Sequence, residues 1–231
     1  MIFENLNKRK HVYEYYEEDI PKQELIEDLL HKTWQVTPSK QNIMPYKVSV
    51  IGPDDFETKN RIYQKVVGNH KYMEEEGVKI GHIDEVSNEI NPHYRHILHN
   101  PYLIVFSQRL CTEKDINPFY KQKIKEGHFM EQAAEEWVHR IKSSTAVEVG
   151  LFAENFASLC LEQDIDYSFT VCFPGDVKQW KDIPFVEHPV LLLMSIGKAK
   201  VYRRDFLPQA SSDLDYKTAF ENVVHFERSK N

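Results

Sequence analysis

Residues 37–52, TPSKQNIMPYKVSVIG, join a polar, proline-containing loop to a short strand, and this junction decides the fold class. The loop, TPSKQNIMPY at 37–46, contains two prolines, a serine and an asparagine in no helical or strand period. Proline fixes φ, and Ser and Asn favour local turns, so the composition predicts a stiff loop. KVSVI at 47–51 alternates as a half-buried strand does. The chain therefore passes from a helix at 21–34, through a rigid loop, into a sheet.

The rest of the chain predicts helices that flank one small sheet. Helices are expected at 21–34, 56–67, 129–141, 144–163 and 211–226, and strands at 47–51, 102–107, 168–173 and 189–197. The pattern at 144–163 is the longest, and one side of it carries Ala146, Gly150, Ala153 and Ala157. Small side chains let another helix approach closely, so this helix is expected in the core or at a subunit interface. No repeat or linker interrupts the pattern, and we expect an α+β fold in a single domain over 1–231.

The charge distribution excludes one class of partner and suggests a site for another. The 231 residues carry a net charge of -7, which argues against general nucleic-acid binding. Two basic islands nevertheless stand near opposite ends of the chain, NKRKH at 7–11 and GKAKVYRR at 197–204. They form an anion site if the fold brings them together, and two solvated patches if it does not.

The cysteines and the apolar runs indicate a cytoplasmic protein. Cys111, Cys160 and Cys172 are odd in number and lack CxxC spacing, which is typical of a reducing compartment. The first ten residues carry charges where a signal peptide needs its apolar core. The longest apolar run, at 190–194, is too short to span a bilayer. Cys160 falls on the small-residue side of its helix and is expected to pack, whereas Cys172 lies in a strand and stays open to either role.

Several catalytic patterns are absent or incomplete. No glycine-rich phosphate loop occurs, so a bound phosphate would have to be held by Arg and Lys side chains. His93, His96 and His99 recur every third residue, which spreads them around a helix, and Glu136 with His139 lacks a matching second pair. No metal site is expected, although a metal-dependent enzyme using the histidine-rich region 82–99 remains an alternative. Ser195 and Lys198 fit S-x-x-K formally, but at the end of a strand rather than at a helix start.

Four segments together resemble the FMN-dependent nitroreductase family. The loop is similar to the family's P-S-x-x-N-x-Q-P-W signature: Pro38, Ser39, Asn42 and Pro45 match, and Met44 and Tyr46 replace Gln and Trp. The other three are NKRKHVYEYYEEDIP at 7–21, EVGLFAENFASLCLEQDID at 148–166 and GKAKVYRRDFLP at 197–208. They resemble the family's arginine-rich start, its central interface helix and its closing basic segment, in the family's order.

The resemblance implies a fold, a cofactor and a reaction. The fold would be nitroreductase-like, with a central mixed or antiparallel sheet flanked by helices, in an intertwined homodimer with the flavin at the interface. The cofactor would be FMN, with NADH or NADPH as co-substrate. Electrons would pass in a ping-pong mechanism to nitroaromatic, quinone or related small acceptors. The cofactor carries this chemistry, so no catalytic side chain is assigned. The alternative is a flavin-binding protein on the same fold with little or no NAD(P)H turnover.

The resemblance also implies which residues hold the cofactor. Arg9, with Arg203 or Arg204, would bind the phosphate through charge-assisted contacts. Lys10 or His11 would lie near the flavin's pyrimidine ring, and Tyr13 stands where the family usually has Arg or Lys. The loop would present Pro38, Ser39 and Asn42 to the flavin of the other subunit. Main-chain N–H groups near Thr170, Val171 and Cys172 would face the reactive ring nitrogen, where the family often has glycine. These departures bear on turnover and substrate preference more than on FMN binding.

Overall fold

The computed structural model describes most of the chain between residues 11 and 202. The described residues are 11–39, 42–75, 94–109, 122, 125–127, 131–202 and 222–224, of which 69–75 and 131–143 are described by their backbone alone. Among these residues, no helix combines the length and the apolar character that a segment crossing a bilayer needs.

A four-stranded antiparallel sheet forms the centre of the fold. Its strands are β2 (Tyr46–Ile51), β3 (Tyr102–Gln108), β4 (Asp166–Thr170) and β5 (Val190–Gly197), in the order β2-β3-β5-β4. All neighbours are antiparallel, as in the pairs Val48↔Phe106 and Phe106↔Leu192. β3 lies inside the sheet, and six of its seven residues are buried. The sequence predicts this, because YLIVFS is a continuous apolar run of the kind found in strands covered on both faces.

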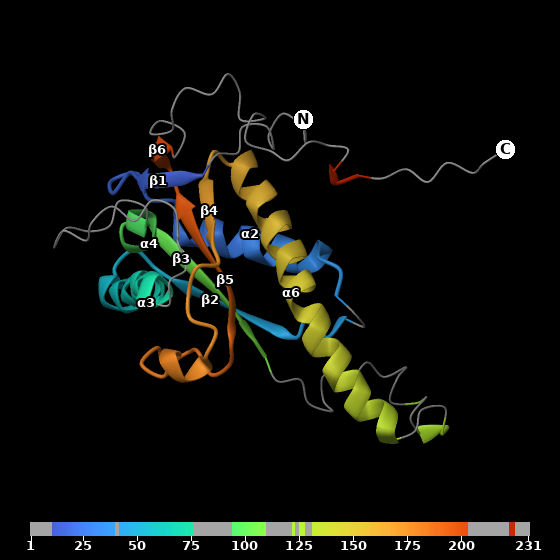
Figure 1. Cartoon of the computed structure of the whole chain (residues 1–231). Coiled ribbons are helices and arrows are strands. Elements are labelled where there is room, and N and C mark those ends of the chain that lie inside the picture. Colours follow the sequence, from blue (N-terminus) through green and yellow to red (C-terminus); the bar gives the residue numbers. More distant parts are fainter. Residues whose placement is uncertain are drawn as a thin grey trace.

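Helices cover both faces of the sheet (Figure 1). α2 (Gln23–Val36) and α6 (Glu131–Glu162) pack on the face that carries Ile104 and Phe106. α3 (Phe56–Glu75), α4 (Arg95–Leu98) and the 3-10 helix η4 (Val177–Trp180) pack on the face that carries Leu103 and Val105. Alternate residues of β3 therefore enter two separate cores, as the period of two in a strand requires. The α+β class is confirmed, and the sheet is antiparallel throughout.

A second, two-stranded sheet joins segments from near the start and near the end of the span 11–202. β1 (Val12–Tyr15) and β6 (Ala199–Tyr202) pair antiparallel, with Val12 opposite Tyr202. Ser168 ties this ribbon to β4, because its Oγ accepts from Val12 N at 2.7 Å and donates to Val12 O at 3.0 Å. These two strands were not predicted. They are four residues long, lie in polar segments and have irregular register, so they carry no clear period.

Other boundaries differ from those expected from sequence. The helices predicted at 129–141 and 144–163 are one helix, α6, since no Pro or Gly between them ends the hydrogen-bond ladder. α3 continues to Glu75 rather than ending at 67. The strand predicted at 168–173 runs from Asp166 to Thr170, because its last pair with β5 is Thr170↔Leu193. The helix predicted at 211–226 lies outside the described residues, except for 222–224.

Candidate functional site

The loop between α2 and β2 is held from within by Ser39. Its hydroxyl donates to Glu148 Oε2 at 2.6 Å and accepts from Met44 N at 2.8 Å, and Asn42 N donates to Ser39 O at 3.0 Å. Asn42 and Met44 have φ values of 58° and 50°, in the left-handed region. Asn tolerates this region because its short polar side chain bonds locally. The Ser39 hydroxyl therefore serves the loop itself, and one acceptor lone pair remains for a ligand.

Two further side chains fix the loop from outside. The Arg109 guanidinium donates to Ile43 O at 2.5 Å and to Met44 O at 3.1 Å, immediately after β3. Asn155 on α6 donates from Nδ2 to Thr37 Oγ1 at 3.1 Å. The stiffness expected from the prolines thus has a second source, since a charged donor just after β3 and an amide donor on α6 satisfy oxygens of the loop.

A second group of predicted site residues gathers around the end of β4. His96 of α4 lies between them: its Nε2 is 3.0 Å from Thr170 Oγ1, and its ring centroid is 5.2 Å from that of His11. The His11 ring also lies 5.9 Å from the Tyr13 ring, at right angles to it. Val171, which follows Thr170 and lies beyond the last ladder pair, is 67% exposed. The structure therefore brings three predicted residues, His11, Tyr13 and Thr170, to the base of an exposed main-chain segment.

The basic residues predicted to bind phosphate lie outside the described residues. They are Arg9, Arg203 and Arg204, and Lys10, expected near the pyrimidine ring, also lies outside the described residues. The strands to which these residues attach are adjacent, since Val12 pairs with Tyr202. Two described lysines of the second basic island are engaged by acidic side chains: Lys198 lies 3.1 Å from Asp19, and Lys200 lies 3.3 Å from Glu14.

The two groups of predicted residues lie apart in one chain. The loop that carries Pro38, Ser39 and Asn42 contacts α6 and the end of β3, whereas His11 and Thr170 contact α4. Figure 1 shows the loop and α4 on opposite sides of α6 in that view. In a single chain, the two groups of predicted residues are therefore separate.

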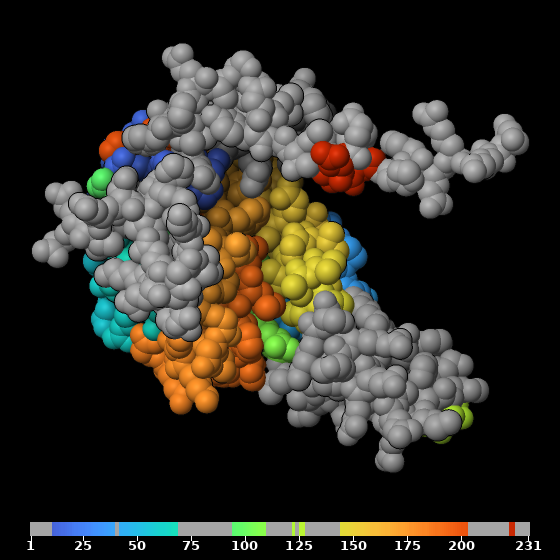
Figure 2. Space-filling view, viewed as in Figure 1, coloured from blue at the N-terminus to red at the C-terminus, as the bar shows by residue number. Residues whose placement is uncertain are grey.

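An exposed apolar surface borders the loop. On α6, Val147 is 64% exposed and Leu151 44% exposed, and Figure 2 shows residues of this helix (yellow) at the molecular surface. The small-residue side of the helix divides, because Ala153 and Ala157 enter the core while Ala146 and Gly150 face outward. A cavity of about 390 Å³ opens beside the loop and is lined by Leu30, Trp34, Met44, Tyr46, Val48, Arg109 and Phe152. Burial, with a smaller effect of Glu148, raises the pKa of Tyr46 to about 12, so its phenol stays neutral.

In the described part of the chain, the residues considered for metal binding or nucleophilic catalysis do not come together as a site. There, no three His, Cys, Asp or Glu side chains gather closely enough to hold a metal ion. His96 turns toward Thr170 while His99 turns toward Glu17, at 3.3 Å, and His93 lies outside the described residues. Ser195 is buried and accepts from Asn100 Nδ2 at 3.1 Å.

The two described cysteines differ in environment. Cys160 is buried, as its place on the small-residue side predicts, and burial raises the pKa of its thiol far above the usual range. Cys172 is exposed beyond the end of β4. The buried Cys160 thiol therefore packs as a small apolar group and is not an activated nucleophile.

Three residues at the site were not assigned to it from sequence: His96, Arg109 and Glu148. His96 belongs to HYRHILH, a pattern that fits a solvated helix face equally well. Glu148 is a buried carboxylate on a largely apolar helix, and such a residue in VEVGL is a weak local signal for a buried partner. Arg109 gives no local signal, because its acceptors are 65 and 66 residues earlier in the chain.

Solved structures with the same architecture match nearly the whole chain. One is a candidate NAD(P)H:FMN oxidoreductase from Staphylococcus epidermidis, with a TM-score of 0.65 and 15% identity, covering 98% of this chain and 96% of that chain. Another is a candidate nitroreductase in complex with FMN from Exiguobacterium sibiricum, with a TM-score of 0.63 and 13% identity, covering 98% and 97%. A third is a nitroreductase family protein from Streptococcus pneumoniae, with a TM-score of 0.57 and 14% identity, covering 98% and 100%.

Comparisons based on sequence give no match. No protein-family model matches the chain, and no curated protein matches it. At 13–15% identity, the structural likeness shows the fold: this chain has the fold of nitroreductase-family and NAD(P)H:FMN oxidoreductase structures. The resemblance expected from the four sequence segments is confirmed at that level.

Proposed function

We propose that this chain is an FMN-dependent oxidoreductase that passes electrons from NADH or NADPH to a small nitroaromatic, quinone or related acceptor. The observation that carries the proposal is the likeness over 98% of the chain to a candidate nitroreductase in complex with FMN. The local geometry supports it, because residues that resemble the family's flavin contacts are held by hydrogen bonds at two places. These are Ser39 in the loop and Thr170 at the end of β4. The single domain over 1–231 and the cytoplasmic location are parts of the same proposal.

The residues present fit the two ends of an FMN molecule. A phosphate dianion needs cations, and the paired strands β1 and β6 join directly to the segments that carry Arg9, Arg203 and Arg204. A flavin ring edge needs fixed polar groups. The buried imidazole of His96 contacts both Thr170 and His11, and the exposed residues Val171 and Cys172 follow Thr170 directly. Tyr13 contacts His11 and would contribute packing where the family usually places a cation.

Bound FMN would supply the electron transfer, so the protein's task is to bind and orient it. The loop is suited to orientation, because Ser39, Glu148 and Arg109 hold its main chain at fixed points. Pro38 and Asn42 are exposed on it and would contact the flavin of the partner subunit. The side chains of Val171 and Cys172, where the family often has glycine, would leave less room beside the reactive part of the flavin. This feature favours the second candidate, a flavin-binding protein with little NAD(P)H turnover.

An absorbance spectrum before and after anaerobic addition of NADH or NADPH tests the proposal. Protein purified after incubation with FMN and gel filtration is expected to be yellow, and at least one of the two nucleotides is expected to bleach it. A yellow protein that neither nucleotide bleaches would support the flavin-binding alternative. A colourless protein that does not retain added FMN would contradict both, and metal analysis of that sample would test the metal-dependent alternative.

Dimerisation is the second part of the proposal, because the two groups of predicted residues lie apart in one chain. The exposed apolar residues of α6 and the open cavity beside the loop supply a surface that a second copy would cover. Apolar side chains exposed next to one another at a protein surface are a common feature of subunit interfaces. In the dimer, the loop of one copy would stand beside His11 and Thr170 of the other.

Leu151→Ala is expected to raise the dimer dissociation constant about tenfold, since each copy would lose buried apolar area at the interface. Sedimentation velocity over a concentration series measures this, with FMN affinity measured in parallel. Phe56→Ala is the matched control, because Phe56 is 52% exposed on α3, on the opposite face of the sheet. Equal dissociation constants for Leu151→Ala and wild type, or a monomeric wild type that binds FMN normally, would argue against the shared site.

A further inference from the structure

His96 occupies a junction between two strands of different sheets. Its side chain is buried, with 1% of its surface exposed, and it lies on the four-residue helix α4. Its Nε2 lies 3.0 Å from Thr170 Oγ1, at the end of β4. Its ring meets the His11 ring, just before β1, at 5.2 Å between centroids and an angle of 77°. One imidazole therefore touches two of the residues proposed to contact the flavin.

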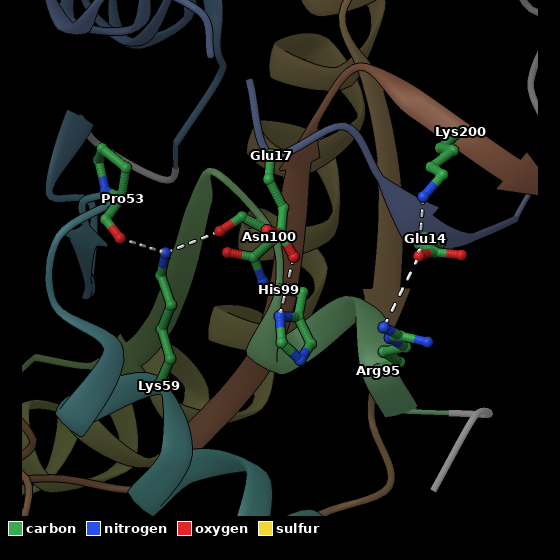
Figure 3. A network of polar contacts seen from close by, with 8 residues as sticks. All are labelled: Glu14, Glu17, Pro53, Lys59, Arg95, His99, Asn100 and Lys200. Atoms are coloured by element: carbon green, nitrogen blue, oxygen red, sulfur yellow. Dashed lines mark hydrogen bonds and ion pairs between the residues drawn. The ribbon is translucent and has the colours of Figure 1, made fainter. Parts of the chain in front are cut away.

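Contacts on the inner side of α4 fix where this imidazole stands. The Asn100 side chain donates from Nδ2 to His96 O at 2.7 Å, to Ile97 O at 3.0 Å and to Ser195 Oγ at 3.1 Å. Lys59 Nζ in turn donates to Asn100 O at 2.7 Å (Figure 3). A helix of one turn has too few internal hydrogen bonds to hold itself, so these donors set its position.

Polar contacts on the outer side tie α4 to β1 and to the residues just after it. Arg95 lies 3.8 Å from Glu14 of β1, and His99 Nδ1 lies 3.3 Å from Glu17. Figure 3 shows both pairs, with Lys200 of β6 reaching the same Glu14. α4 is thereby attached to the β1–β6 ribbon, to β5 and to α3 at once, and His96 is the residue on it that faces Thr170.

We propose that His96 is a positioning residue of the flavin site, which acts through Thr170 and His11. The proposal rests on the proposed function. The hydrogen bond to Thr170 fixes the last residue of β4, and with it the start of the exposed segment that Val171 and Cys172 form. The ring contact fixes His11 relative to that segment. A histidine that only filled the core would affect stability and leave the properties of bound FMN unchanged.

The test compares FMN affinity and the spectrum of bound FMN in His96→Phe and wild type. Phe keeps the ring and removes the hydrogen bond to Thr170, so we expect the FMN Kd to rise about tenfold and the flavin absorbance maximum to shift. His96→Gln, whose amide can replace the imidazole nitrogen near Thr170, is expected to recover most of the affinity. His31→Phe is the control, because His31 is exposed on α2, on the opposite face of the sheet from α4, with its ring stacked on Trp34 at 5.6 Å between centroids, and its FMN Kd is expected to stay within twofold of wild type.

Thr170→Val supplies a second test that leaves His96 unaltered. If His96 acts through this hydroxyl, Thr170→Val alone weakens FMN binding, and the His96→Phe/Thr170→Val pair loses less affinity than the sum of the two. Should His96→Phe fail to fold, Thr170→Val and His96→Gln still decide the matter. Wild-type FMN binding together with unchanged affinity and spectrum in these variants overturns this inference alone. Failure of the wild-type chain to bind FMN overturns the proposed function, and this inference with it.

Discussion

Raising the pH from about 7 to about 9.5 is expected to increase the free energy of unfolding by about 2 kcal/mol through Lys59. Only 2% of this side chain is exposed, and its burial lowers the pKa from 10.5 to about 8 against the opposing effect of Asp55 and Asp54. Between these two values the unfolded chain binds more protons than the folded chain, so stability rises with pH. Urea denaturation at fixed protein concentration, ionic strength and flavin content measures the change.

Lys59→Met is expected to remove this pH dependence. The amine donates to Asn100 O at 2.7 Å, to Pro101 O at 3.1 Å and to Pro53 O at 3.5 Å, two of which Figure 3 draws. Met fills the space without a donor, so these buried carbonyls lose a partner at every pH. The variant should therefore fall further below wild type at about pH 9.5 than at pH 7, by about 2 kcal/mol.

Two conditions make the comparison decisive. Burial raises the pKa of Tyr15 and of Tyr46, so these phenols favour the unfolded chain as pH rises past about 10, and the measurement must stop below that. Arg61→Met on the same helix is the control, because a guanidinium keeps its charge throughout this range. Its stability difference from wild type is expected to be equal at both pH values. Parallel pH profiles for wild type and Lys59→Met would refute the assignment to Lys59.

The parts of the fold that follow from sequence are those whose signal is local. β3 is buried on both faces, and its continuous apolar run is enough to predict that. The loop at 37–46 is recognisable from its own prolines and its Ser and Asn. In contrast, β1 and β6 form a ribbon because Val12 meets Tyr202 and Ser168, which no window of the sequence contains.

The residues of the candidate site also divide into those with a local signal in the sequence and those without one. Ser39 and Asn42 are identified by a short motif, but the partner that fixes Ser39 is Glu148, 109 residues later. His96 contacts Thr170, 74 residues later, and His11, which lies just before a strand of the other sheet, so the histidine-rich surroundings of His96 in the sequence indicated neither contact. Local patterns therefore identify groups that bind, whereas the groups that position them depend on tertiary contacts.

Gly197→Ala is expected to lower the free energy of unfolding by about 3 kcal/mol, at the upper end of the range for overpacking. A Cβ at this position would lie 2.5 Å from Pro101 Cδ, 2.6 Å from Pro101 Cγ and 2.9 Å from Tyr15 Cδ1. Neither neighbour yields easily, since the proline ring is rigid and Tyr15 OH donates to Ser195 O at 3.0 Å. Chemical denaturation of the variant and of wild type, at the same pH and protein concentration, measures the loss.

Gly68→Ala is the matched control, because the same methyl group there meets nothing within 4 Å. Gly68 lies inside α3, where Ala is the better helix former, so a gain of about 0.5–1 kcal/mol is expected. Opposite signs for the two substitutions would locate the effect in the crowding between β5, Pro101 and β1. Because Tyr15 belongs to the strand that follows His11, Gly197→Ala should also weaken FMN retention, whereas Gly68→Ala should not. A Gly197→Ala protein as stable as wild type would mean that β1 can move away from β5 at no cost, and a rigid flavin site at this junction would then lose its structural basis.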